Sequence, residues 1–161
     1  MPVTDVQHDM NNLTLTIVAE FAAPVSRVWE VYADPRQLER VFGPPTYPAT
    51  FVDHSLTPGS RSTYYMTSPE GEKHAGIWDI KTVAEPSGFT FEDAFSDADF
   101  NVTADLPVSQ NSYAFEATDG GTRATYVSTY ATAEALQQVL DMGVVEGATS
   151  AINQIDDLLA A

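Results

Sequence analysis

Residues 21–38 read FAAPVSRVWEVYADPRQL and contain the signals that end one strand and begin two helices. Pro24 predicts a helix start, because its fixed φ suits the first turn and its missing N–H leaves no helical hydrogen bond unmade there. Apolar residues from Val25 to Tyr32 then recur at helical spacing. Asp34-Pro35 predicts the end of this helix and the beginning of a second short one. We therefore expect two small helices directly after the first strand.

The segments on either side predict strands. Upstream, Leu13-Thr14-Leu15-Thr16-Ile17 alternates apolar and polar residues, which indicates a half-buried strand running to about Phe21. Downstream, runs rich in β-branched and aromatic residues alternate with turns containing Gly and Pro, and these favour an antiparallel meander. The runs are Thr50–His54, Ser60–Thr67, Ala75–Ala84, Phe89–Asp93, Ser112–Thr118 and Thr122–Tyr130. Asp119-Gly120-Gly121 is a hairpin signal between the last two, because these residues accept positive φ readily. About seven strands are expected.

The last segment, from about Ala133 to Leu159, predicts one long amphipathic helix. Small residues at Gly143, Gly147 and Ala151 are spaced four apart on one side of it. Each glycine inside a helix costs about 1 kcal/mol relative to alanine, so a compensating gain is expected. Two interpretations remain open: close packing of the helix on the sheet, and space left between helix and sheet for a ligand.

Composition and charge limit the classes of protein. The chain has 161 residues, of which 43% are hydrophobic, and this fits one globular domain, expected over residues 13–161 after an N-terminal tail at 1–12. Seven Lys and Arg against 23 Asp and Glu give a net charge of -16, which disfavours nucleic acid and anionic lipid as partners. No apolar run approaches the roughly 18 residues of a membrane span, so we expect no membrane insertion and a cytoplasmic protein. The absence of cysteine excludes disulfides and cysteine nucleophiles.

Several motifs together resemble one known superfamily. The early ones are residues 21–29, Ala33-Asp34-Pro35-Arg36-Gln37-Leu38 and Phe42-Gly43-Pro44-Pro45; the later ones are Pro69-Glu70-Gly71, Asp119-Gly120-Gly121-Thr122-Arg123, Met142-Gly143-Val144-Val145-Glu146-Gly147 and Gln154-Ile155-Asp156-Asp157-Leu158-Leu159. In this order they resemble the SRPBCC superfamily, in the branch similar to the C-terminal domain of the activator of heat-shock protein ATPase. The resemblance covers about residues 13–159.

This resemblance implies an α+β helix-grip fold, in which a curved antiparallel sheet of about seven strands wraps around a long C-terminal helix. It also implies a deep cavity between sheet and helix, of the kind that START-like and pollen-allergen-like relatives use for lipids, hormones and polyketides. It does not imply a reaction, because one fold supports many functions.

The cavity wall is expected to be aromatic. Large residues on the predicted strands are the candidates for binding a ligand, together with residues near a mouth and the two helix glycines. The set is Phe51, Tyr64, Met66, Trp78, Phe91, Tyr113 and Phe115 on the strands, Tyr32, Phe95 and Met142 near the mouth, and Gly143 and Gly147 on the helix. The alternative for most of the aromatic residues is ordinary core, because the sequence does not show which strand positions face inward. Such a wall would suit a flat apolar ligand with one or two polar substituents.

Residues for catalysis are few. Asp93, Glu116 and His74 are the candidates for general acid or base, with Tyr64 or Tyr113 orienting a substrate. The alternative is that these strand residues point to solvent. Arg61 and Arg123 are interpreted either as partners of a buried acid or as members of surface ion pairs.

Metal and cofactor motifs are missing from the sequence. The three histidines show no metal-ligand spacing. The loop that begins Asp97-Ala98-Asp99-Phe100-Asn101 resembles a calcium loop, but Val102 and Val108 stand where the turn glycine and the bidentate glutamate belong. No nucleophile elbow, phosphate loop or dinucleotide fingerprint occurs, so we expect no metal and no cofactor.

The leading hypothesis is binding of a hydrophobic small molecule, aromatic or lipid-like, in a cavity between the sheet and the C-terminal helix. One alternative is a cyclase-like or hydrolytic enzyme that uses the same cavity. Another is an interaction module that regulates a chaperone ATPase, which the resemblance suggests. A homodimer is also left open, because nothing in the sequence decides the oligomeric state.

Overall fold

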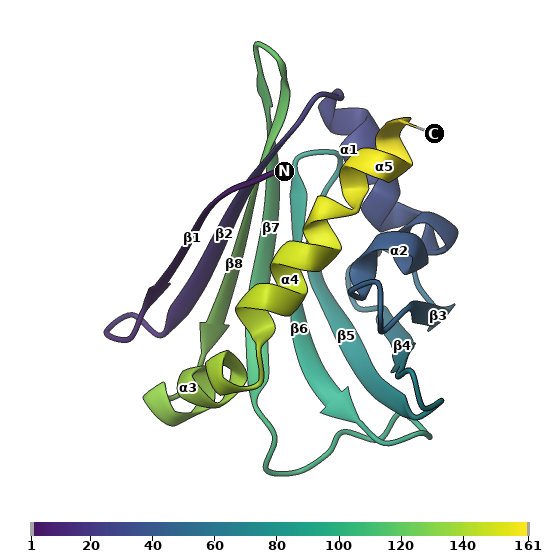
Figure 1. The fold of residues 1–161 in the computed structure, drawn as a ribbon, viewed down its shortest axis with the longest axis vertical. Coiled ribbons are helices and arrows are strands. Elements are labelled where there is room, and N and C mark those ends of the chain that lie inside the picture. The colour runs from purple at the N-terminus through teal and green to yellow at the C-terminus, as the bar shows by residue number, and fades with distance from the viewer. Residues whose placement is uncertain (1, 161) are drawn as a thin grey trace.

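A single antiparallel sheet forms most of the molecule. The computed structural model describes residues 2–160, in which the strands follow the order β1-β2-β8-β7-β6-β5-β4-β3 and the sheet curves around helix α4 (Figure 1). The strands are β1 (Val3–Asp9), β2 (Thr14–Phe21), β3 (Ala49–Asp53), β4 (Arg61–Thr67), β5 (Lys73–Ala84), β6 (Gly88–Ser96), β7 (Val108–Thr118) and β8 (Gly121–Tyr130). This arrangement confirms the expected α+β helix-grip fold.

Helices α1 (Val25–Ala33) and α2 (Pro35–Phe42) follow strand β2, as the sequence predicts. The Asp34 carboxylate accepts a hydrogen bond of 2.9 Å from the backbone N–H of Arg36, and Pro35 occupies the first turn of α2. This cap satisfies an amide that the helix itself cannot pair. The Asp34-Pro35 signal therefore determines both the end of α1 and the direction of α2.

Strand β1 was not expected, because residues 1–12 were predicted as a tail. Val3–Asp9 pairs with β2 along its length, from Val3 opposite Ala19 to Asp9 opposite Thr14. Its side chains are mostly exposed and polar, so the alternation of apolar and polar residues that marks a half-buried strand is absent. Backbone hydrogen bonds hold this edge strand, and they leave no signal in the sequence.

The C-terminal segment is also different from the expectation of one long helix. It consists of α3 (Ala133–Asp141), α4 (Val144–Asn153) and α5 (Ile155–Ala160). Gly143 lies between α3 and α4 with φ of +85°, a left-handed conformation that glycine adopts without strain. The free-energy penalty of a glycine inside a helix therefore does not apply to Gly143, because this residue is outside both helices. Figure 1 shows α4 crossing the sheet while α3 lies near the ends of β7 and β8.

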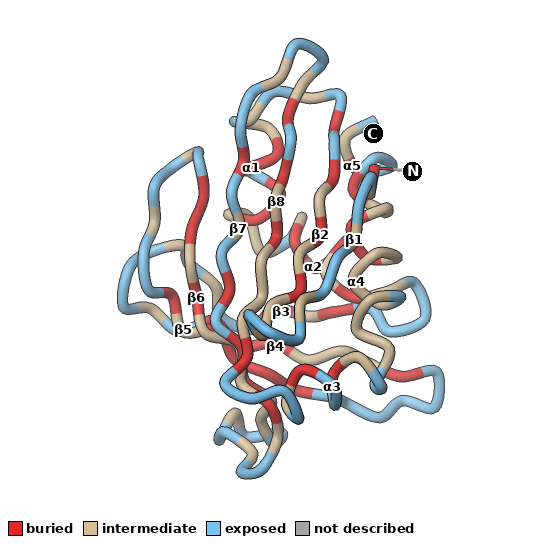
Figure 2. Tube along the Cα trace, turned by 90° about the vertical axis from the view of Figure 1, so that its left-hand side faces the viewer, coloured by how far each residue is buried: buried red, intermediate tan, exposed pale blue. Residues whose placement is uncertain are grey.

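The main core lies beneath α1 and α2. Trp78, Phe51, Phe91 and Phe89 are almost fully buried and contact one another by stacking and edge-to-face packing. The Tyr32 and Tyr126 hydroxyls form a hydrogen bond of 2.7 Å that joins α1 to β8. Figure 2 shows the buried positions recurring along the strands between exposed ones, as expected for a sheet with one covered face.

His54 adds a polar link within this core. Its Nε2 lies 2.7 Å from the carbonyl oxygen of Tyr32, and its Nδ1 lies 2.7 Å from the Ser62 hydroxyl. Because a carbonyl only accepts, Nε2 carries the proton and donates to it. Burial lowers the pKa of His54, which favours the neutral ring. The imidazole thus fastens the end of α1 to strand β4.

The two helix glycines predict opposite effects on stability. Gly143→Ala should lower the free energy of unfolding by about 1–2 kcal/mol, because alanine is strained at φ of +85°. Gly147→Ala should raise it by about 0.5–1 kcal/mol, because residue 147 lies within α4 and a Cβ there has no neighbour within 4 Å. Urea unfolding measures both. Equal effects of the two substitutions would contradict the break at residue 143.

Candidate functional site

A cavity lies between the sheet and the helices α3 and α4. Its volume is about 380 Å³, and a smaller space of about 100 Å³ adjoins it. The two spaces share Tyr64, Asp93, Phe95, Ser109, Tyr130, Val139 and Val144 in their walls. The cavity therefore continues from beneath α4 to the ends of β6 and β7.

The structure brings eight of the predicted residues to the cavity wall. From the sheet come Tyr64, Met66, Asp93, Phe95 and Tyr113, from the link between α3 and α4 come Met142 and Gly143, and from α4 comes Gly147. Met142 is 55% exposed, which places it at the rim. These residues come from three strands, β4, β6 and β7, and from the C-terminal segment, so the fold alone makes them neighbours.

The other candidates lie elsewhere. Tyr32, Phe51, Trp78, Phe91 and Phe115 belong to the main core and do not line the cavity. His74 is exposed, with its ring 6.0 Å from that of Tyr47. Glu116 is also exposed, and its Oε1 lies 3.2 Å from Nη1 of Arg123. Neither group faces the cavity, so Asp93 is the predicted acid that the structure places within reach of a ligand.

Sequence reasoning missed much of the wall. The missed residues are Leu15 and Ile17 from β2, Phe42 and Pro44, Ser109 and Asn111 from β7, Tyr126, Ser128 and Tyr130 from β8, and Val139, Val144, Ala148 and Ile152 from the helices. The paired registers Ile17–Tyr126, Leu15–Ser128 and Asn111–Ser128 put the strand residues on one face. Their alternate spacing within each strand places them on one face whether or not they are aromatic, and this spacing was the available signal.

Asp93 on β6 is held by a tyrosine from two strands away. The Tyr64 hydroxyl donates a hydrogen bond of 2.9 Å to Asp93 Oδ1. Tyr64 belongs to β4, and its phenol crosses β5 at Gly76, where an added Cβ would collide with the phenol oxygen. The absence of a side chain at Gly76 therefore makes this contact between β4 and β6 sterically allowed.

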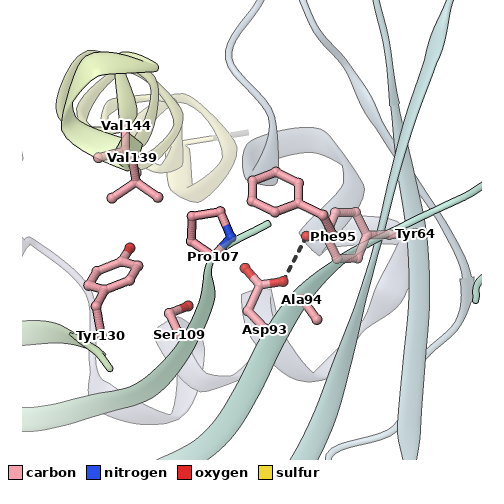
Figure 3. Close-up of a pocket in the computed structure, with 9 residues that line it drawn as sticks. All are labelled: Tyr64, Asp93, Ala94, Phe95, Pro107, Ser109, Tyr130, Val139 and Val144. Carbon is pink, nitrogen blue, oxygen red and sulfur yellow. Dashed lines mark hydrogen bonds between the residues drawn. The ribbon is translucent and has the colours of Figure 1, made fainter. Parts of the chain in front are cut away.

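Burial raises the pKa of Asp93 to about 7, and the hydrogen bond from Tyr64 opposes this shift by favouring the charged form. Burial also raises the pKa of Tyr64 well above its usual value, so this hydroxyl stays protonated and able to donate. Figure 3 shows Asp93 between Ser109 and Tyr64, with Val139 of α3 and Val144 of α4 across the space. The cavity thus contains a carboxyl group that changes charge near neutral pH.

A row of polar side chains continues from Asp93 across the sheet. The Ser128 hydroxyl donates to Asn111 Oδ1 at 2.6 Å, and Asn111 Nδ2 donates to the Ser109 hydroxyl at 2.9 Å. These bonds satisfy the buried amide within an otherwise apolar wall. The cavity can therefore hold an apolar body and present polar groups along one side.

The small residues of α4 leave room in the cavity. A Cβ added at Gly147 would meet no heavy atom within 4 Å. Close packing of helix on sheet, one of the two interpretations of the glycine spacing, would give contacts at this point. Because Gly147 also lines the cavity, this favours open space between helix and sheet.

The remaining polar motifs have structural partners. Arg61 pairs with Asp79 at 2.7 Å and Arg123 pairs with Glu116, both on the outside. Asp97 Oδ1 accepts backbone N–H groups of Asp99 and Asn101 at 2.9 and 3.0 Å and so stabilises its own turn. Within residues 2–160, no three His, Cys, Asp or Glu side chains are grouped as a metal site. No helix there is long and apolar enough to cross a membrane.

Comparison with known proteins identifies the family. Residues 22–160 match the family described as "Activator of Hsp90 ATPase homolog 1-like protein". The chain belongs to this family. Membership of the Hsp90 ATPase activator homolog family supports a ligand-binding helix-grip domain. A comparison with curated proteins gives no match.

Solved structures from bacteria share the fold of this family member. Protein Ms6760 from Mycobacterium smegmatis is 70% identical, with a TM-score of 0.92 over 98% of this chain and 97% of that one. A protein from Arthrobacter aurescens is 42% identical, with a TM-score of 0.94 over 98% and 92% of the two chains. A protein from Staphylococcus epidermidis is 26% identical, with a TM-score of 0.84 over 98% and 94%.

The Tyr64–Asp93 contact predicts a pH titration. In a carbon-detected NMR titration, the Asp93 carboxyl should have its midpoint near pH 7. Tyr64→Phe should move the midpoint upward, because the lost donor stabilises the charged form. Gly76→Ala should do the same by displacing the phenol. A midpoint near 4 in the unmodified protein would contradict burial of this carboxyl.

Proposed function

We propose that this protein binds a hydrophobic small molecule, aromatic or lipid-like, in the cavity between the sheet and α4. The observation that carries the proposal is a space of about 380 Å³ that the helix leaves open at Gly147. This volume is within the range of about 300–1,000 Å³ found for small-molecule sites. Family membership supports the same conclusion.

The chemistry of the wall supports a mainly apolar occupant. Met66, Phe95, Val139 and Ile152 offer apolar surface, and burying such surface is the main favourable contribution to binding a molecule of this kind. The polar row from Asp93 to Ser128 offers the few directed contacts that orient a ligand. We place the protein in the cytoplasm as part of this proposal.

Filling the open space at residue 147 tests the proposal. Binding of the neutral dye Nile red, followed by its fluorescence, should weaken at least about tenfold in Gly147→Leu, because the leucine side chain would occupy the cavity. Gly147→Ala is the matched control, since it adds one methyl group and should retain most of the affinity. Circular dichroism checks that both variants fold. Unchanged affinity in a folded Gly147→Leu protein would refute the cavity as the binding site.

Native mass spectrometry of freshly purified protein identifies an occupant directly. A reproducible noncovalent adduct that disappears on denaturation would give the mass of a molecule taken up during expression. Its loss in Gly147→Leu would locate that molecule in the cavity.

A second candidate function is a cyclase-like or hydrolytic reaction, and the position of Asp93 favours it. A carboxyl with a pKa of about 7, beside a tyrosine hydroxyl in an apolar cavity, suits a general acid or base at neutral pH.

Regulation of a chaperone ATPase, the third hypothesis, stays a prediction, and a pull-down with the chaperone tests it. Self-association is tested by sedimentation.

The enzyme hypothesis makes a specific prediction for any compound that the protein converts. Asp93→Asn should lower kcat by about 10²–10⁴, the usual contribution of a general acid or base, while the compound still binds. Glu116→Gln and His74→Asn should leave kcat unchanged, because both side chains are exposed outside the cavity. Full turnover in Asp93→Asn would exclude this residue from the reaction.

A further inference from the structure

Charge is distributed unevenly around the cavity. Among residues 2–160, Asp93 is the one side chain of the cavity wall that carries a formal charge when ionised at neutral pH. None of the seven Lys and Arg residues lines it, and no histidine does. The guanidinium groups of Arg36, Arg61 and Arg123 pair with acids on the outer surface instead. An anionic ligand would find no counter-ion in this cavity.

Asp93 also has hydrogen-bonding capacity that the protein does not use. Oδ1 accepts the Tyr64 hydroxyl, while Oδ2 has no hydrogen-bond donor within the described part of the chain. Figure 3 shows the carboxyl group at the cavity wall, with one oxygen joined to Tyr64 and the other turned away from it. A carboxylate accepts several hydrogen bonds, so a donor on a ligand would complete its set.

The groups around Asp93 are neutral at physiological pH. Tyr64 from β4, Tyr113 from β7 and Tyr130 from β8 face the carboxyl, and burial raises the pKa of each of these phenols. Ser109 lies opposite Asp93 in the strand register, and Val139 and Val144 cover it from the helices. No positive charge from any of these elements balances an ionised Asp93.

We infer that the occupant of the cavity is a hydrophobic amine, whose ammonium group pairs with Asp93 while its apolar body lies along Met66, Phe95 and Gly147. This inference rests on the proposed function and names its ligand class. A buried charge is stable only when paired, and an ammonium group supplies both the opposite charge and the missing donor. Tyr64 and Phe95 are aromatic members of the wall, and a ring face within reach of the ammonium group would add attraction for it.

The surface charge of the protein also favours a cationic ligand over an anionic one. A net charge of -16 produces a negative potential that raises the local concentration of cations and lowers that of anions. Asp141 and Glu146, both exposed, flank the rim residue Met142 in sequence. A hydrophobic carboxylate would therefore be disfavoured both on approach and inside the cavity.

Three compounds that differ only in their polar group test the inference. Decylamine, decanol and decanoate are compared below their micelle concentrations at pH 8, by displacement of Nile red from the full chain. Decylamine should displace the dye at a concentration at least about tenfold lower than decanoate, with decanol between them. In Asp93→Asn the amine should lose its advantage over decanol, while decanol itself keeps its affinity.

Glu92→Gln is the matched control. It removes one negative charge from the neighbouring position of β6, where Glu92 is bonded to Gln110 at 2.8 Å on the exposed side of the sheet. It should leave the order of the three compounds unchanged, which separates the effect of Asp93 from that of net charge.

The outcomes are distinguishable. If neither Nile red nor any of the three compounds binds, the proposed function fails and this inference fails with it. If decanol displaces the dye but the amine is no better than decanoate, or keeps its advantage in Asp93→Asn, the inference is overturned while the proposed function stands. The comparison in the unmodified protein does not depend on the folding of any variant.

Discussion

The pairing of β2 with β8 is the constraint on which the remaining structure depends. It joins Thr14–Phe21 to Thr122–Thr129, more than a hundred residues later, in one unbroken register. Because of it, the meander from β3 to β8 and the N-terminal hairpin of β1 and β2 form one sheet. A twisted sheet of this width presents one curved face, and the C-terminal helices cover that face. The residues of the cavity wall are neighbours only because β2 pairs with β8 and the C-terminal helices cover the resulting sheet.

The curved face of the sheet forms a packed core at one end and a cavity wall at the other. Beneath α1 and α2 it is filled by aromatic side chains, and the hydrogen bond between Tyr32 and Tyr126 joins helix to sheet there. Beneath α4 the helix presents small residues, so the sheet is not fully covered and a cavity remains. Asp93 is located where this cavity begins, bonded to Tyr64 and buried enough to have a raised pKa. The aromatic core beneath α1 and α2 therefore supports the strands whose other ends form the cavity wall beneath α4.

Local chemistry allowed most of the fold to be predicted, and contacts between distant segments explain what was not. The Asp34-Pro35 cap and the Asp119-Gly120-Gly121 turn act within a few residues, so the sequence indicates both. Strand β1 is held by backbone bonds to β2, and its polar side chains give no periodic signal. Gly143 fits a helix by spacing alone, and its left-handed φ depends on where α3 and α4 must lie. For the site, aromatic residues such as Trp78 and Tyr113 look alike in sequence, and only the strand register separates core from cavity wall.

Two adjacent residues at the end of α4 hold opposite sides of the molecule. Asn153 Oδ1 accepts the backbone N–H of Val3 in β1 at 3.2 Å, and Gln154 Nε2 donates to the carbonyl of Gly43, just after α2, at 2.7 Å. These bonds have a consequence for protein synthesis. Strand β1 remains without this helix contact until Asn153, 150 positions later, has been translated. Until then the apolar sheet face that α4 covers is open to water, and the net charge of -16 favours repulsion between chains in this state.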